Sequence, residues 1–354
     1  MAMNRGEWSE FYAILSMLVS PELEIGNEKL ESITKQLYSV KKLSIEEQNT
    51  VIDYVLTNNS GIEIYFDNVI QKLISNSELL VSKDAIYNEI CLAQTGAGAF
   101  EIRTVQPLLN KMTTSGILKS KSMSKSDLKA TLFDIRLGDN VALKYSIKSS
   151  LGSPATILNS SSHTNFIYEI ENISLDDINK INSIKTNTKL VDRIKEIKKL
   201  NGIIKFDKVE CENFEYNLKL IDSKMPEYLG NILLDSYSSQ NKNLKELFLK
   251  AGEFKDQTFA LKKLGDFLEG ISFGFVPSFK WNGINDVNGG LVVVKKDGKT
   301  IILDLIYFKQ TVINYLINET KLDSPSSTRY HMLELYVENG KIYFKLNLQI
   351  RYKK

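Results

Sequence analysis

The sequence predicts an α/β protein in which a mixed sheet is flanked by helices and the C-terminal half is rich in hairpins. Three observations support this: a helical period near the N-terminus, apolar and polar residues in alternation mid-chain, and tight-turn dipeptides between later apolar runs. The chain has 354 residues, of which 43% are hydrophobic and 25% charged. This balance excludes a disordered chain, a collagen-like fibre and a disulfide-stapled miniprotein.

The N-terminal region is predicted to be largely helical. Apolar side chains recur with a helical period over residues 5–19, which indicates an amphipathic helix. Asn4 suits the N-cap, and Glu7 then falls at the third helical position, as a capping box requires. We expect residues 28–92 to be mostly helical, with one strand at 62–66.

The pattern changes to strand-like alternation in the middle of the chain. Residues 130–137 and 141–149 are predicted to form two strands around the turn Gly138-Asp139-Asn140. A further strand is expected at 165–171, followed by a charged helix at 186–201.

The last third of the chain contains the two strongest hairpin signals, Asp297-Gly298 and Asn339-Gly340. Helices are expected near 227–236, 241–250, 257–270 and 307–318, and strands at 290–294, 300–306, 333–337 and 342–348. We expect two domains: residues 1–205, with the helical N-terminal region and the central sheet, and an α+β region at 206–354.

Composition narrows the class of protein further. The 45 Lys and Arg residues nearly balance the 43 Asp and Glu residues, which neither requires nor excludes one DNA-binding cleft. No apolar run approaches the ~20 residues of a membrane helix, so no membrane association is expected. Cys91 and Cys211 lie far apart without CxxC spacing, which fits a reducing cytoplasm. Only His163 and His331 are present, so a multi-histidine zinc site is not expected.

The central hairpin holds the most informative chemistry. Ser146 and Lys148 alternate with apolar residues, so they share one face of their strand. A loop with an odd number of residues places Asp134 opposite Ser146 and one pleat from Lys148, whereas a two-residue loop puts Asp134 on the other face. Converging Asp and Lys side chains suit metal-assisted phosphodiester hydrolysis: the carboxylate holds Mg²⁺, and the lysine orients water or stabilises charge on the phosphate. An ordinary surface hairpin would explain the same pattern.

Such a site needs a second carboxylate, because Ser146 stands where an acidic residue is usual. Glu7 is the first candidate, since it falls on the apolar side of its helix, although capping alone would explain it. Glu169 and Glu171 on the strand at 165–171 are alternatives, and Glu10 lies nearer the polar edge of the first helix.

Several motifs resemble HpaII-like type II restriction endonucleases, and together they span the whole chain. The most specific are the run Ser146–Asn159, continued by Thr164-Asn165-Phe166, and the closing Leu346–Arg351. The others are Asn4–Glu10, Gly289-Gly290 before Val292–Lys295, Tyr315-Leu316 with Thr320, and Ser324–Arg329.

The resemblance implies a PD-(D/E)XK nuclease core within residues 1–205, dependence on Mg²⁺, and cleavage of both DNA strands at a short palindrome, CCGG. The family's metal aspartate maps to Asp134 and its nuclease lysine to Lys148. Phe133 replaces the usual proline and Ser146 the usual acid. A palindrome is most simply cut by a homodimer, and a cognate DNA methyltransferase would protect host DNA.

Region 206–354 is then expected to serve DNA recognition or dimerisation. G·C pairs present acceptors that arginine reads well, and Arg329 and Arg351 lie in the specific C-terminal motifs. Ser149, Ser150 and Asn159 are candidates for contacts to phosphate or sugar. The alternatives are a catalytically inert, sequence-specific DNA-binding protein and a repair nuclease that recognises DNA structure.

Overall fold

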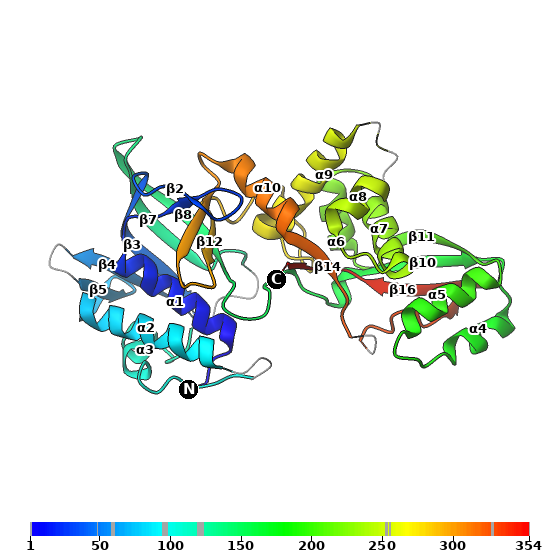
Figure 1. The fold of residues 1–354 in the computed structure, drawn as a ribbon, viewed down its shortest axis with the longest axis horizontal. Helices are drawn as coiled ribbons and strands as arrows, with labels where there is room; N and C mark the ends of the chain where they lie inside the picture. Colours follow the sequence, from blue (N-terminus) through cyan, green and yellow to red (C-terminus); the bar gives the residue numbers. More distant parts are fainter. Residues whose placement is uncertain are drawn as a thin grey trace. The chain divides into compact units, whose positions relative to one another are not determined.

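The chain folds into two compact units, each of which draws on two segments of the sequence (Figure 1). A computed structural model describes residues 2–47, 49–57, 61–93, 98–118, 124–251, 254, 256–326 and 329–353. Unit 1 combines Met1–Ala155 with Asn285–Tyr315, and unit 2 combines Thr156–Ile284 with Leu316–Lys353. The expected boundary at residue 205 does not coincide with either division, since strand β11 (Ile203–Val209) runs through it. The predicted class, an α/β protein with a large mixed sheet flanked by helices, is confirmed.

Unit 1 is built on a ten-stranded sheet with the order β2-β1-β13-β12-β8-β7-β3-β4-β5-β6. Its strands are β1 (Ile25–Gly26), β2 (Ser32–Thr34), β3 (Tyr38–Glu47), β4 (Thr50–Thr57), β5 (Gly61–Phe66), β6 (Val69–Ser75), β7 (Leu128–Asp134), β8 (Asp139–Ser149), β12 (Gly290–Val294) and β13 (Thr300–Asp304). The prediction that residues 28–92 are mostly helical is therefore wrong. Only its last part forms a helix, α2 (Asn76–Leu92).

Burial shows a period of two in β5 but a less regular pattern in β3, β4 and β6. Ile52 and Tyr54 on β4 and Ile62 and Ile64 on β5 are fully buried, whereas their strand neighbours are more exposed. In β3 the register shifts between Val40 and Lys42, so the simple alternation is broken. This bulge obscures a strand signal that an unbroken alternation would have given.

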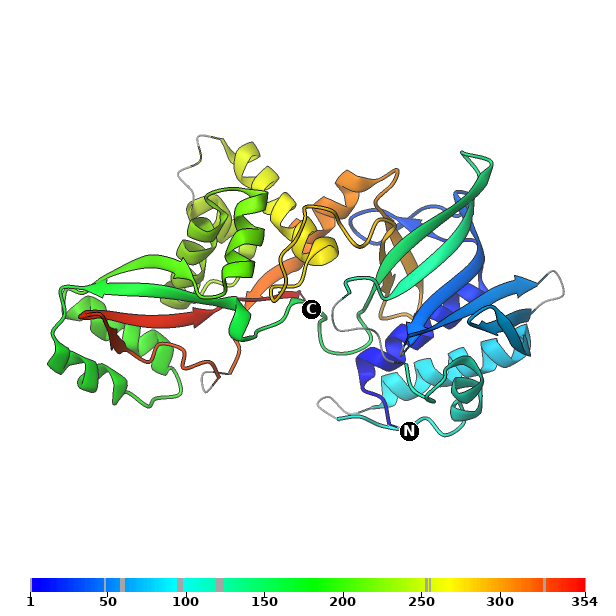
Figure 2. The same cartoon turned by 180° about the vertical axis from the view of Figure 1, so that it is seen from behind.

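Helix α1 (Arg5–Val19) confirms the predicted N-terminal helix and its cap. The Asn4 side chain accepts from the Glu7 N–H, and the Glu7 carboxylate accepts from the Asn4 N–H at 2.7 Å. Its apolar stripe, including Trp8, Phe11 and Leu15, is buried in the core of unit 1. Helices α1 and α2 lie against each other on one face of the sheet (Figures 1 and 2). A short helix, α3 (Gln106–Met112), completes this layer.

The middle of the sheet, where β3, β7, β8 and β12 lie side by side, carries the candidate functional residues. β3, β7 and β8 are successively antiparallel, and β8 then pairs in parallel with β12. Parallel neighbours require a crossover connection. Here the residues between β8 and β12 include Thr156–Ile284, the larger segment of unit 2.

The register of the β7–β8 hairpin differs from the predicted one. Asp134 pairs with Asp139 across a four-residue loop, and Leu128 pairs with Tyr145. Leu128, Ala130 and Leu132 are buried and share the core face of β7 with Asp134. The residues between them, Lys129, Thr131 and Phe133, therefore lie on the opposite face. The prediction that Asp134 lies opposite Ser146 is therefore wrong.

The turn itself explains the difference. Asp134 Oδ1 accepts from the Arg136 N–H at 2.9 Å, and the Gly138 N–H donates to the Asp134 carbonyl. Gly138 has a φ of +68°, which glycine adopts without strain. An aspartate that bonds to the backbone two residues later is a turn former, and here that role sets the even loop length.

Unit 2 combines helices with two small sheets. One sheet has the order β11-β10-β16-β15, with β10 (Asn165–Glu171), β15 (Tyr336–Glu338) and β16 (Lys341–Asn347). The other has the order β14-β17-β9, with β9 (Thr156–Leu158), β14 (Thr320–Asp323) and β17 (Gln349–Tyr352). The helices are α4 (Leu175–Asn182), α5 (Lys189–Lys199), α6 (Glu212–Ile221), α7 (Met225–Ser239), α8 (Leu244–Ala251) and α9 (Gln257–Glu269), with the short helical pieces Ser162–Thr164 and Gly270–Gly274.

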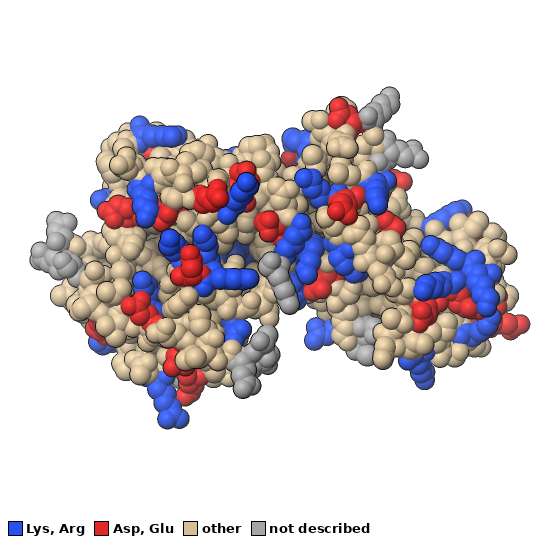
Figure 3. All heavy atoms as spheres, in the orientation of Figure 1, with Lys and Arg blue, Asp and Glu red and all other residues tan. Residues whose placement is uncertain are grey.

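Most predicted elements of the second half are confirmed, including both hairpins and the helix α10 (Lys309–Glu319) that spans the division between the units. In the part of the chain that the structure describes, no helix has the length and apolarity to cross a membrane. Basic and acidic side chains are interspersed on the face of each unit drawn in Figure 3, as the near-zero net charge leads one to expect.

Candidate active site

Three polar residues meet where β7 begins beside β8. Asp127, directly before β7, donates its N–H to the Tyr145 carbonyl and so lies next to Ser146. Its Oδ2 accepts from the Ser146 hydroxyl at 3.0 Å and from the Ile147 N–H at 2.7 Å. The carboxylate is thereby fixed in direction by two donors on the neighbouring strand.

Lys148 joins the same cluster from the next outward position of β8. Its Nζ donates to Ser146 Oγ at 2.8 Å and to the Ile147 carbonyl at 3.0 Å. It lies 3.8 Å from Asp127 Oδ2, so the two groups form an ion pair. Ser146 thus lies between the ammonium and the carboxylate and contacts both.

A cavity of about 390 Å³ opens beside this cluster, between β3, β7 and helix α1. The last registered pair of β3 with β7 is Ser44 with Lys129, and the residues beyond that pair line the cavity. Asp127 and Ile147 line it from the sheet, and Glu10 lines it from α1. Glu10 and Asp127 are thus two carboxylates from different elements that line the same cavity.

The electrostatics of this region favour an anionic ligand. Burial, together with the charge of Lys148, lowers the pKa of Lys125 to about 8, although Asp127 acts in the opposite direction. The ammonium groups of Lys125 and Lys148 are thus close enough to repel each other. A phosphate brought to this place would relieve that repulsion.

Asp134, the predicted metal aspartate, lies elsewhere. Its side chain is 1% exposed and faces the core side of the sheet, opposite to Lys148. Besides the turn contact, its Oδ2 accepts from the Tyr307 hydroxyl at 2.9 Å. The Arg136 guanidinium stacks on the Tyr307 ring, 4.4 Å from its centroid. The structure does not bring Asp134 together with Lys148.

The predicted second carboxylates are engaged in other contacts. Glu7 closes the capping box of α1. In unit 2, Glu169 pairs with Lys341 at 2.9 Å, and Glu171 pairs with Lys205 at 2.7 Å. Glu10, the candidate nearest the polar edge of its helix, is the one that lines the cavity with Asp127.

The candidate DNA-binding residues fall in both units. In unit 1, Ser149 ends β8 and accepts from the Leu151 N–H, and the Ser150 N–H donates to the Val294 carbonyl. In unit 2, Asn159 is exposed after β9, and Arg329 is exposed and donates its N–H to the Ser326 carbonyl.

Arg351, the remaining candidate, lies on β17 in unit 2. Its Nε is 3.1 Å from Asp323 Oδ2 on β14, the strand with which β17 pairs. Arg351 thus has an ionic partner within its own sheet. Residues 327–328 of the motif Ser324–Arg329 lie outside the described residues.

The sequence did contain a signal for Asp127. It stands directly before the alternating residues of β7, nineteen positions before Ser146. Only the even loop, with Asp134 serving the turn, places Asp127 rather than Asp134 beside Ser146. The predicted loop length therefore placed Asp134, rather than Asp127, opposite Ser146.

Residues 4–352 match the HpaII restriction endonuclease family, and the chain belongs to that family. It is a site-specific endodeoxyribonuclease of the type II restriction class.

A particular relative covers the whole length. The chain is 35% identical over 359 aligned residues to the type II restriction enzyme HpaII of Haemophilus parainfluenzae, covering 99% of this chain and 98% of that protein. No solved structure matches the chain.

Proposed function

We propose that this endonuclease has a PD-(D/E)XK core, depends on Mg²⁺ and cuts both strands of double-stranded DNA at a short palindrome, CCGG. One observation carries the catalytic part of this proposal: Asp127, Ser146 and Lys148 meet on two adjacent strands. The sequence specificity rests on the similarity to the HpaII enzyme.

The arrangement of elements supports the PD-(D/E)XK assignment. Strands β3, β7 and β8 are successively antiparallel, β12 adds in parallel to β8, and helix α1 packs against β3, β8 and β12. The aspartate precedes the first strand of the β7–β8 hairpin and the lysine is on the second. With Asp127 in place of Asp134, Ser126 and Ser146 take the positions of the family's proline and acid.

The residues at the cavity fit a hard, oxygen-seeking cation. Five carboxylates line the cavity: Asp127, Glu10, Glu46, Glu47 and Asp53. Asp53 and Glu47 accept hydrogen bonds from neighbouring Ser, Thr and Lys groups, and Asp127 Oδ2 accepts from two donors, so we assign the ion to Asp127 and Glu10. Oxygen ligands such as carboxylates suit Mg²⁺, whereas structural zinc is usually held by Cys and His. Mg²⁺ binds through one or two carboxylates and retains several waters, so Asp127 and Glu10 suffice. When bound, the ion polarises the scissile phosphate and lowers the pKa of a water.

Each protein group then has a distinct task. Lys148, held by Ser146 and the Ile147 carbonyl, directs its ammonium toward charge that develops on the phosphate and orients the attacking water. Ser146 replaces the usual acid and links Lys148 to Asp127, so it positions both side chains. Lys125 adds positive charge that attracts the DNA backbone.

Recognition and assembly complete the proposal. Arg329 and Arg351 are proposed to read guanine, and Ser149, Ser150 and Asn159 to contact phosphate or sugar. A homodimer would present two sites to a palindrome, one for each strand. A methyltransferase acting on the same sequence would protect the host. The engaged Asp127–Ser146–Lys148 cluster favours an active enzyme over an inert DNA-binding protein.

Digestion of a phage DNA of known sequence tests the proposal. With Mg²⁺ we expect discrete fragments whose ends map to CCGG, no cutting in EDTA, and protection after methylation of CCGG sites. Fragments that map to another sequence would contradict the specificity. A smear without preferred ends, or preferential cutting of branched or mismatched DNA, would contradict the proposed sequence-specific reaction.

A further inference from the structure

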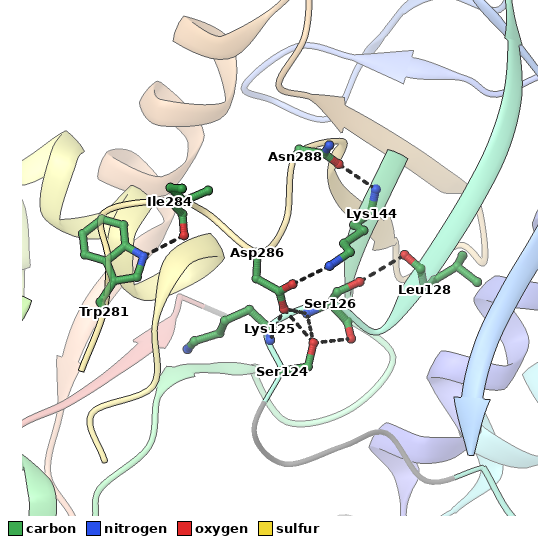
Figure 4. Close-up of polar contacts among 9 residues, drawn as sticks. All are labelled: Ser124, Lys125, Ser126, Leu128, Lys144, Trp281, Ile284, Asp286 and Asn288. Atoms are coloured by element: carbon green, nitrogen blue, oxygen red, sulfur yellow. Dashed lines mark hydrogen bonds and ion pairs between the residues drawn. The ribbon is translucent and has the colours of Figure 1, made fainter. Parts of the chain in front are cut away.

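Asp286, which lies four residues before β12, gathers donors from two distant segments (Figure 4). Its Oδ2 accepts from the Ser124 hydroxyl at 2.6 Å, the Lys125 N–H at 3.0 Å and the Ser126 N–H at 3.2 Å. Its Oδ1 accepts from Lys144 Nζ at 2.8 Å. The three groups that donate to Oδ2 thus belong to residues 124–126, which directly precede Asp127.

The segment that carries Asp286 is itself anchored to β8. The Asn288 side chain accepts from the Lys144 N–H at 2.8 Å, and the Gly289 N–H donates to the Lys144 carbonyl at 2.8 Å. Lys144 lies two residues before Ser146 on the same face of β8. Asp286 therefore links residues 124–126, which lead into Asp127, to β8, the strand that carries Ser146 and Lys148.

The chemistry of this carboxylate suits a fixed clamp. Four donors contact this carboxylate, three of them at Oδ2 and one at Oδ1, which fixes its orientation. Burial alone would raise the pKa of Asp286, but hydrogen bonds from Lys144 and Ser124 and the charge of Lys144 lower it to about 2. The group is thus ionised at every pH at which a nuclease would work.

We propose that Asp286 is a positioning residue for cleavage: it fixes residues 124–126 so that Asp127 holds its place beside Ser146 and Lys148. This inference rests on the proposed function, in which Asp127 holds the metal. Asp286 does not line the cavity shared by Asp127 and Glu10, so its effect on the reaction passes through residues 124–126.

The physical basis is the accuracy that a catalytic carboxylate requires. Without Asp286, the N–H groups of Lys125 and Ser126 and the Ser124 hydroxyl lose the acceptor that orients this segment. Asp127 would still be able to reach Ser146, but over a wider range of positions. A displacement of about 1 Å in a catalytic group can cost about 10²-fold in rate.

Steady-state cleavage by Asp286→Ala, Asp286→Asn and Lys144→Gln tests the proposal. Asp286→Ala is expected to lower kcat by about 10- to 100-fold with little change in KM. Asp286→Asn keeps one acceptor oxygen, so it should recover part of the loss. Lys144→Gln leaves the three contacts to residues 124–126 intact, so its loss of kcat should be clearly smaller than that of Asp286→Ala.

A readout without DNA isolates the effect on the metal site. In calorimetric titrations with Mn²⁺, Asp286→Ala should need roughly tenfold more Mn²⁺ for half-saturation than wild type. Loss of a group that orients a metal ligand, here Asp127, commonly weakens metal binding by about this factor. Glu78→Gln is the matched control, because Glu78 forms a comparable ion pair with Lys111 in unit 1, remote from β8. Its kcat and Mn²⁺ titration should match those of wild type.

Several outcomes would overturn the inference. A folded Asp286→Ala variant with wild-type kcat and wild-type Mn²⁺ affinity would overturn it. A Lys144→Gln variant as impaired as Asp286→Ala would also overturn it, because the effect would then come from the ion pair alone. If Asp286→Ala does not fold, Ser124→Ala takes its place, and an unchanged Mn²⁺ titration for it would refute the proposal. A wild-type protein that does not cut DNA would instead refute the proposed function.

Discussion

The Lys148 ammonium is held by two acceptors, Ser146 Oγ and the Ile147 carbonyl, and Asp127 is close by. These contacts orient it before DNA arrives. We expect Lys148→Ala to lower kcat by about 10²- to 10³-fold, the usual loss when one preorganised donor is removed from a transition state. Specific binding measured in Ca²⁺ by gel shift should persist. Loss of binding in a folded Lys148→Ala would mean that Lys148 serves affinity rather than catalysis.

Glu10 and Glu7 lie on the same helix and give a matched pair of variants. Glu10 lines the cavity beside Asp127, whereas Glu7 caps the helix. Glu10→Gln should raise the Mg²⁺ concentration needed for half-maximal cleavage by about tenfold or more, because one of two carboxylates is lost. Glu7→Gln should leave that concentration unchanged and lower stability by only about 0.5–1 kcal/mol. The reverse pattern would restore Glu7 as the metal ligand.

At the scale of single residues, the sequence located Lys148 and Ser146 correctly on one strand face but misplaced the aspartate. Lys148 and Ser146 are found by the period of β8 alone, which needs no knowledge of pairing. The aspartate depends on the length of a turn, and Asp134 determines that length through its contact with the Arg136 N–H. A turn-forming aspartate and a catalytic one look alike until the register is known.

Among the elements, β13 ends in a carboxylate that is sensitive to pH. Asp304 is 0% exposed, and burial raises its pKa above the ordinary 3.8 despite hydrogen bonds from Tyr307 and Tyr38. The folded protein therefore binds this proton more tightly than the unfolded chain does. Its contribution to stability is present below about pH 4 and is lost as the pH rises through the folded-state pKa.

The prediction concerns the difference between wild type and Asp304→Asn. The free energy of unfolding of wild type, relative to the variant, should decline as the pH is raised from about 4 toward neutrality. Urea denaturation followed by circular dichroism at a series of pH values measures it. A relative stability that rises over the same interval would contradict the raised pKa of Asp304.

The elements themselves were predictable where the periodic signal was clean. Helix α1 shows its cap and its apolar stripe, and the hairpins at Asp297-Gly298 and Asn339-Gly340 carry their turn residues. The predicted strand at 62–66 is confirmed as β5, but β2, β3, β4 and β6 were missed, in part because the bulge in β3 interrupts the alternation. The ten-stranded sheet also joins strands distant in sequence, such as β1 with β13, and such pairing leaves no local pattern.

For the molecule as a whole, the connection between β8 and β12 is the main organising feature. The two strands are parallel neighbours, and Thr156–Ile284 of unit 2 is inserted between them. Neither insertion point is marked by a change in composition, so the boundary was expected at residue 205 instead. The central sheet thus belongs to a discontinuous unit that only the strand pairing reveals.

The central claim is that Asp127, and not Asp134, holds the metal beside Lys148. Cleavage of CCGG-containing DNA in Mg²⁺ by Asp127→Asn and Asp134→Asn, each first shown to be folded, tests it most directly. A metal ligand contributes several kcal/mol to the transition state, so Asp127→Asn should lose at least about 10³-fold in kcat while Asp134→Asn stays within about tenfold of wild type. Wild-type cutting by Asp127→Asn, or its loss in a stable Asp134→Asn, would contradict the account.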